Sequence, residues 1–151
     1  MAIVVQPADP SQLPSAITLL QEANLPTEGV AGQFGSYLAA VDQGAVVGLV
    51  GLEISGSAAL LRSLVVASSH RGQGLGKRLV QAAEEIAPRQ GVKSLYILTE
   101  TAELFFRLLR YKEVDRQDIP PEVRLMSEFR TLCPASAQAM AKDLVGGRPI
   151  D

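Results

Sequence analysis

The stretch from Ser63 to Glu85, SLVVASSHRGQGLGKRLVQAAEE, constrains the fold more than any other part of the chain. Its apolar, β-branched beginning predicts a strand, its end has the three- and four-residue spacing of an amphipathic helix, and a glycine-rich segment separates the two. Helix N-termini expose unpaired N–H groups that attract anions, and glycines let the backbone approach a phosphate closely. A tight turn with close strand–helix packing would explain one or two glycines, but glycines at three alternate positions favour a phosphate-binding loop.

Two well-known phosphate loops do not fit this stretch. A P-loop ends in Gly-Lys followed by Ser or Thr, whereas Lys77 is followed by Arg78. The dinucleotide-binding fingerprint needs its third glycine one residue later than Gly76, within a parallel unit. The sequence therefore favours a phosphate-binding junction of another kind.

Upstream of this junction, the sequence predicts a strand, a helix and an antiparallel meander. The strand covers residues 2–6, and the helix follows the polar segment PADPS and ends before Pro26. Residues 29–34 are a candidate for a short helix. Three β-rich runs between residues 37 and 66, separated by the turns DQG and SGS, predict the meander.

Downstream, the sequence predicts a helix that ends before Pro88, a strand at residues 94–99 and a second helix at residues 102–111. A helix that joins two strands usually makes them parallel, so we expect the meander to continue into a βαβ unit. In the tail, residues 123–132 are a candidate for the last strand, and residues 135–144 have good helix propensity.

Length and composition predict one domain with a small partner. The 151 residues suffice for a continuous core, and we expect a single domain over residues 1–151. No segment approaches the ~18 apolar residues of a membrane span, the N-terminus does not resemble a signal peptide, and Cys133 is the only cysteine. These features predict a cytoplasmic protein, and the net charge of −2 argues against a nucleic-acid-binding surface.

The hexapeptide RGQGLG, residues 71–76, resembles the R/Q-x-x-G-x-G/A motif of the GNAT acetyltransferases. The resemblance runs from about Ile3 to Val114 and includes the meander, the helix after the motif and the next strand and helix. It implies an α/β GNAT fold, with a mixed, mostly antiparallel sheet that splays around the arm of acetyl-CoA and with helices on both faces. Backbone groups of the strand would pair with the pantetheine arm, and the loop amides would hold the pyrophosphate. The donor-binding residues implied in this way are Leu64, Val65, Val66, Arg71, Gly72, Gln73, Gly74, Leu75, Gly76 and Lys77.

A narrower resemblance concerns the acceptor. The segments LPTEGV, ALLRSLVV, TETAELFFRLLRY and LCPASAQAMAKDL look like those of N-acetyltransferases from bacterial arsenic-resistance operons, relatives of enzymes that acetylate arsinothricin and phosphinothricin. The resemblance implies a small, amino-acid-like acceptor that carries an acidic arsenic or phosphorus group, and with it a role in arsenic resistance.

The chain departs from the family pattern at the group that protonates the departing thiolate. Many GNAT enzymes place a tyrosine in an FY pair near the end of the second helix, where this chain has Phe105 and Phe106. Either the thiolate leaves with the help of water or another group, or Tyr111 or Cys133 supplies the proton. Tyr111 is also the usual aromatic residue at this helix end, where packing is the commoner role.

Few side chains are candidates for the acceptor side. Glu53, near the end of the strand GLVGLEI, and Glu28 are the candidate bases, and Glu28 is also a candidate contact to the acceptor. A lone glutamate is by default a solvated surface residue. Arg62 lies within an apolar strand, where its guanidinium would hold a carboxylate or arsonate through two hydrogen bonds unless it lies on the solvent face. His70 is expected to be an exposed loop residue rather than a base.

These features, with the resemblance, predict an acetyl-CoA-dependent N-acetyltransferase that transfers the acetyl group directly to the amine of a small molecule. The absent tyrosine leaves a second interpretation open, an acetyl-CoA-binding sensor or subunit with little transferase activity, and a purely structural α/β domain is a third. We expect no metal, nucleic acid or membrane as a partner. A homodimer is common among the relatives that the resemblance implies.

Overall fold

A computed structural model describes residues 3–126 and 137–144 of the chain. The strands form one seven-stranded, mixed and mostly antiparallel sheet in the order β1-β2-β3-β4-β5-β7-β6. The chain divides into two compact units, and the strands β3 and β4 contribute to both. Unit 1 consists of Met1–Leu52 and Ser63–Ile86, and unit 2 consists of Glu53–Arg62 and Ala87–Asp151.

The predicted meander and its flanking elements are confirmed. The strand β1 pairs antiparallel with β2, and β2 pairs antiparallel with β3. The first helix begins after a capping box at Asp9, whose side chain accepts a hydrogen bond from the Ser11 amide while Gln12 accepts one from the Asp9 amide. The elements that begin or lie in unit 1 are β1 (Val4–Pro7), α1 (Leu13–Glu22), α2 (Val30–Gln33), β2 (Tyr37–Asp42), β3 (Ala45–Ser55), β4 (Ala58–Val66) and α3 (Leu75–Ile86).

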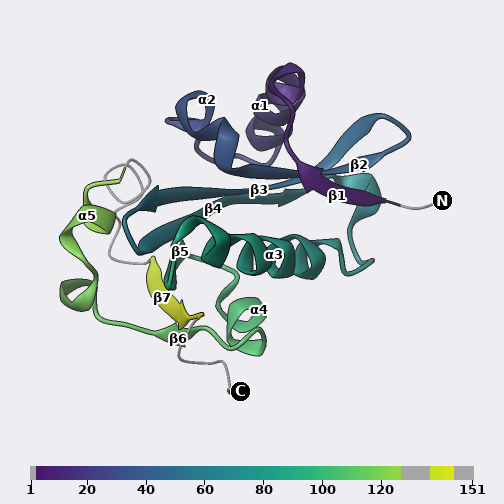
Figure 1. The fold of residues 1–151 in the computed structure, drawn as a ribbon. Coiled ribbons are helices and arrows are strands. Elements are labelled where there is room, and N and C mark those ends of the chain that lie inside the picture. The colour runs from purple at the N-terminus through teal and green to yellow at the C-terminus, as the bar shows by residue number, and fades with distance from the viewer. Residues whose placement is uncertain (1–2, 127–136, 145–151) are drawn as a thin grey trace. The chain divides into compact units, whose positions relative to one another are not determined.

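Within unit 1, helices cover both faces of the sheet. Figure 1 shows α1 and α2 on one side of the strands and α3 on the other. Successive strand residues point to opposite faces of the sheet. Tyr37 and Ala39 of β2 pack with α1 and α2 on one face. On the other face, Gly48 of β3 lies so close to α3 that an added Cβ would be 3.0 Å from Leu79. The buried residues on the α1 side are Ala16, Leu19, Leu20, Val30, Phe34, Tyr37, Ala39, Leu49 and Val65.

Unit 2 confirms the parallel pairing that the βαβ pattern predicts. The beginning of β4 pairs parallel with β5 at three positions, the last of which joins Leu60 to Tyr96. The strand β7 pairs antiparallel with β5 on one side and with β6 on the other. The remaining elements are β5 (Ser94–Thr99), α4 (Glu103–Leu108), β6 (Lys112–Glu113), α5 (Pro121–Arg124) and β7 (Gln138–Asp143).

The tail differs from its prediction. Residues 135–144 have helix propensity, yet Gln138–Asp143 form β7, because hydrogen bonding to β5 and β6 outweighs local preference. The proposed last strand at 123–132 is wrong at its start, since Val123 and Arg124 lie in α5, and residues 127–132 fall outside the described part of the chain. Within the described residues, no helix combines the length and apolar character that crossing a membrane requires.

Candidate functional site

The loop between β4 and α3 takes its shape from glycines in left-handed backbone conformation. Gly72 has a φ of 79° and Gly74 a φ of 78°, values that cost other residues energy. A Cβ added at either glycine would meet no heavy atom within 4 Å. Close packing therefore does not explain these two glycines, and the path of the backbone does.

The same loop exposes backbone donors and cations. The first helical hydrogen bond here runs from the Arg78 amide to the Gly74 carbonyl, at 3.1 Å, so the amides of Leu75, Gly76 and Lys77 precede the helical ladder. Arg71 and Lys77 are exposed, and the Arg71 Nε donates to the Val66 carbonyl at 3.1 Å, which ties the side chain to the end of β4. The arrangement can bind an anion through backbone N–H groups, the helix dipole and two positive side chains.

His70 is held more firmly than an exposed loop residue. Its Nε2 lies 2.8 Å from Oδ2 of Asp42, and its Nδ1 lies 2.8 Å from the Ser69 hydroxyl. The side chains of His70 and Asp42 are 20% and 25% exposed. These contacts fix His70, the residue before Arg71, to the end of β2. From the sequence, Asp42 is predictable only as part of a hairpin turn, because residues 28 positions apart carry no local signal of contact.

The end of β4 combines half-buried side chains with a break in the extended backbone. Leu64 and Val66 are half-buried, whereas Val65 is buried in the cluster on the α1 side. Just before them, Ser63 has a φ of 61°, a left-handed conformation that costs an L-residue about 1–2 kcal/mol. The Ser63 hydroxyl lies 2.8 Å from the hydroxyl of Tyr37. Neither Tyr37 nor Ser63 carries a local sequence pattern that predicts this contact.

Two acceptor-side candidates, Glu53 and Arg62, lie together in unit 2. The Arg62 Nη1 donates to Oε1 of Glu53 at 3.2 Å. The Arg62 side chain is fully buried, whereas that of Glu53 is 15% exposed. The alternative prediction, that Arg62 lies on the solvent face, is therefore wrong. The Arg62 guanidinium forms an ion pair across the hairpin of β3 and β4. Glu28 is exposed, in the turn before α2.

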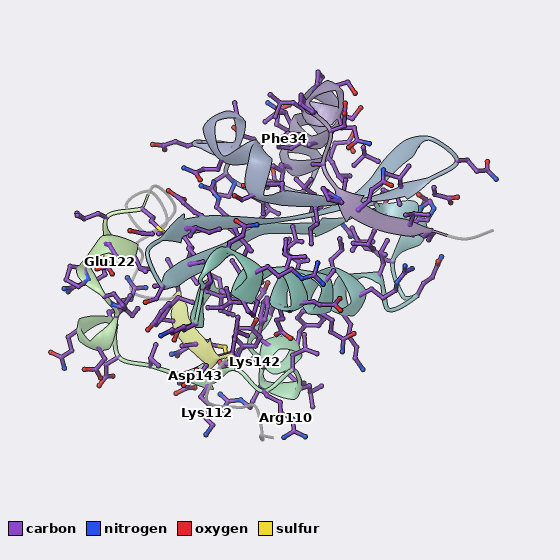
Figure 2. The ribbon with its side chains drawn as sticks, in the orientation of Figure 1. Phe34, Arg110, Lys112, Glu122, Lys142 and Asp143 are labelled. Atoms are coloured by element: carbon purple, nitrogen blue, oxygen red, sulfur yellow. The ribbon has the colours of Figure 1, made fainter. Side chains whose placement is uncertain are left out.

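Phe106 and Tyr111 form a buried aromatic cluster in unit 2. Phe106 is 5% exposed and meets Phe105 and Tyr111 edge to face, with ring centroids 5.0 Å and 5.4 Å away. Tyr111 is 1% exposed, and the Lys142 ammonium lies 5.5 Å from its ring centroid. Figure 2 marks Lys142 on β7. Cys133 lies outside the described residues.

The mixed sheet, the helices on both faces of unit 1 and the glycine loop between β4 and α3 form the α/β arrangement of an acyl-CoA N-acyltransferase fold. A sequence model of the acetyltransferase (GNAT) family matches residues 8–108. The chain belongs to this family. In the described part of the chain, no group of three His, Cys, Asp or Glu side chains is placed to hold a metal ion.

Three relatives give the range of similarity. An uncharacterized N-acetyltransferase from Chlorobaculum tepidum is 33% identical over 63 residues, which are 42% of this chain and 40% of that protein. N-acetylglutamate synthase from Neisseria gonorrhoeae, solved with coenzyme A and N-acetyl-glutamate, has a TM-score of 0.82 at 16% identity and covers 95% of this chain but 35% of its own. PaiA N-acetyltransferase from Thermoplasma acidophilum, solved with coenzyme A, has a TM-score of 0.70 at 16% identity over 95% of this chain and 99% of its own. The two structural similarities support the fold, and this chain spans less than half the length of the first two relatives.

Proposed function

We propose that this chain is an acetyl-CoA-dependent N-acetyltransferase that transfers the acetyl group directly to the amine of a small molecule. One observation carries the proposal: in the loop RGQGLG, Gly72 and Gly74 have positive φ and open space where side chains would stand, directly before the amides of α3. Such a loop suits the pyrophosphate of coenzyme A. Family membership and the coenzyme A in the two solved relatives support the same donor.

In this proposal, the donor lies along elements of unit 1. Residues 71–77 hold the pyrophosphate through backbone N–H groups, with Arg71 and Lys77 supplying positive charge. Leu64 and Val66 line the pantetheine arm, whereas Val65, whose side chain is buried on the α1 side, contributes backbone groups only. The printed pairing of β4 with β5 involves Ala58–Leu60, at the beginning of β4, whereas Leu64, Val65 and Val66 lie at its other end.

The reaction needs a neutral amine next to the thioester. The amine nitrogen attacks the acetyl carbonyl carbon, the carbon–sulfur bond breaks, the nitrogen loses a proton and the coenzyme A thiolate gains one. Glu53 is our candidate for taking the proton, because its side chain has a route to solvent. Tyr111 is the candidate phenol, but its burial and ring contacts favour packing, so water, another group or Cys133 is then the candidate proton source for the thiolate.

For the acceptor, we propose an amino acid with an acidic arsenic or phosphorus group, on the sequence resemblance to arsenic-operon N-acetyltransferases. Arg62 would contact such a group only if the group entered the apolar interior, since the guanidinium is buried and paired with Glu53. Glu28, exposed in the turn before α2, is a second candidate contact for the acceptor amine. We further propose that residues 1–151 act as one acetyltransferase domain, because the family match crosses segments of both units.

A specific observation favours one other function, that of an acetyl-CoA-binding sensor or subunit with little transfer. Phe106 stands where many relatives have a tyrosine, and its ring is enclosed by Phe105 and Tyr111. A donor site without an efficient proton source would bind acetyl-CoA and turn it over slowly.

The deciding experiment measures release of coenzyme A thiol from acetyl-CoA across a panel of amines. The panel contains proteinogenic amino acids, arsinothricin, phosphinothricin and unrelated amines, with acetyl-CoA affinity measured by calorimetry. We expect amine-dependent thiol release and a product heavier by one acetyl group. Tight binding without turnover on any amine would support the sensor, and absence of acetyl-CoA binding would overturn both functions.

A further inference from the structure

Ser63 has a left-handed backbone conformation inside a strand. Among the described residues, the non-glycine residues with positive φ are Asn24, Gln43, Ser63 and Arg110. Asn24 and Arg110 follow helices and Gln43 lies in a hairpin turn, where left-handed geometry reverses the chain. Ser63 instead lies inside β4. Backbone strain within a regular element persists only where its surroundings hold it, and it concentrates at functional positions.

The group that holds Ser63 comes from β2. The Tyr37 and Ser63 hydroxyls lie 2.8 Å apart. Tyr37 is 1% exposed and Ser63 is 6% exposed, so water does not compete for this bond. A hydrogen bond between hydroxyls out of solvent fixes both partners more strictly than one at the surface.

The position of the Tyr37 ring is also built into the sheet. A Cβ added at Gly51 would lie 2.1 Å from Cζ of Tyr37, so the ring crosses β3 where a glycine leaves room for it. The ring of Phe34, labelled in Figure 2, packs against it with centroids 5.5 Å apart. Gly51 and Phe34 thus direct the phenol hydroxyl at Ser63.

The location of the strain connects it to the donor, an argument that rests on the proposed function. If residues 71–77 hold the pyrophosphate and Val66 to Leu64 line the arm, the arm runs backwards along β4. Its acetyl end then comes to the peptide between Ser63 and Leu64. We propose that Tyr37 is a positioning residue for the thioester: its hydroxyl fixes Ser63 in the left-handed conformation and thereby sets the direction of that peptide at the acetyl end of the donor.

The test compares acetyl-CoA with coenzyme A in the Tyr37→Phe variant. Both ligands share the pyrophosphate and the arm, and only acetyl-CoA has the carbonyl that Tyr37 would help to position. Calorimetry should show acetyl-CoA affinity about five-fold weaker, with coenzyme A affinity changed by less than about two-fold. The infrared carbonyl band of bound [1-13C]acetyl-CoA should move towards its position in free acetyl-CoA, a change that altered packing elsewhere would not produce.

Substitutions at Ser63 separate the backbone from the hydroxyl. Ser63→Gly keeps access to positive φ, so it should retain most of the preference for acetyl-CoA, whereas Ser63→Ala should behave like Tyr37→Phe. Tyr96→Phe, the same chemical change in unit 2, is the control and should leave both affinities unaltered. Equal weakening of both ligands, no weakening of either, or Ser63→Gly as impaired as Ser63→Ala would overturn the inference while leaving the transferase proposal intact. If the unaltered protein binds neither ligand, the proposed function fails first.

Discussion

The loop at residues 71–77 and the hairpin tip at residues 53–62 use their polar groups in opposite ways. The loop is largely exposed, its glycines set the backbone path, and the amides at the start of α3 lie outside the helical ladder. The hairpin tip buries the charge of Arg62 and pairs it with Glu53. Backbone groups in an exposed loop can bind a ligand without a change in the fold. Buried charged side chains that pair with one another contribute mainly to the stability of the fold. Substitutions should therefore affect binding in the first region and stability in the second.

The largest effect is expected for Arg62→Ala. Removal of one partner from a buried ion pair leaves the other charge poorly solvated, and Glu53 is only 15% exposed. We expect the free energy of unfolding to fall by about 3 kcal/mol, measured by urea denaturation. The double substitution Glu53→Leu with Arg62→Leu should recover most of that loss. A single variant as stable as the unaltered chain would contradict the structural role of the pair.

Gly74→Val should weaken acetyl-CoA binding by ten-fold or more, about 1.4 kcal/mol, because valine strongly disfavours positive φ and the loop would change its path. Calorimetry measures the affinity. Gly91→Val is a matched control, since Gly91 has a φ of 85° and equally open surroundings. Both variants should lose some stability, but only the first should lose affinity. Unchanged affinity in a folded Gly74→Val protein would remove the loop from the donor site.

Tyr111→Phe should change turnover by less than about two-fold, because the edge-to-face contact with Phe106 needs the ring and not the hydroxyl. Steady-state kinetics on the best amine of the panel would measure it. A fall in kcat of about a hundred-fold with acetyl-CoA affinity kept would instead identify Tyr111 as the acid.

The smallest effect concerns Tyr96 and high pH. Burial, followed by the charge of Asp143, raises the pKa of Tyr96 above its ordinary value of 10.0. Above about pH 10, the unfolded phenol loses its proton while the folded one keeps it, so the free energy of unfolding should fall as the pH rises further. Urea denaturation between about pH 8 and pH 11 should show a shallower decline for Tyr96→Phe. Identical slopes would place the cause of the decline at other groups.

The sequence predicts those parts of the fold that depend on local signals, and not those that depend on contacts between distant segments. The meander, α3, β5 and the loop were predictable because apolar spacing and glycine are local signals. The strand β7 was not, since Ala-rich residues 138–143 gain their strand geometry only from two neighbours distant in sequence. The second helix was predicted over residues 102–111 but ends at Leu108, and a left-handed Arg110 follows it. Contacts between Tyr37 and Ser63, or Asp42 and His70, join residues 26 and 28 positions apart and leave no pattern in either segment.

The interleaving of the two units has a consequence for synthesis on the ribosome. All segments of unit 1 have been translated once Ile86 is made, so unit 1 has its full set of strands and helices before β5 is translated. The hairpin tip is made before that point, but its parallel partner β5 begins only at Ser94, and β7 comes later still. We expect the nascent chain to form unit 1 first. Residues 53–62 would then have no β5 to pair with until the rest of unit 2 has been translated. The order of translation would then complete unit 1, with the loop at residues 71–77, before the unit that contains the Glu53–Arg62 pair.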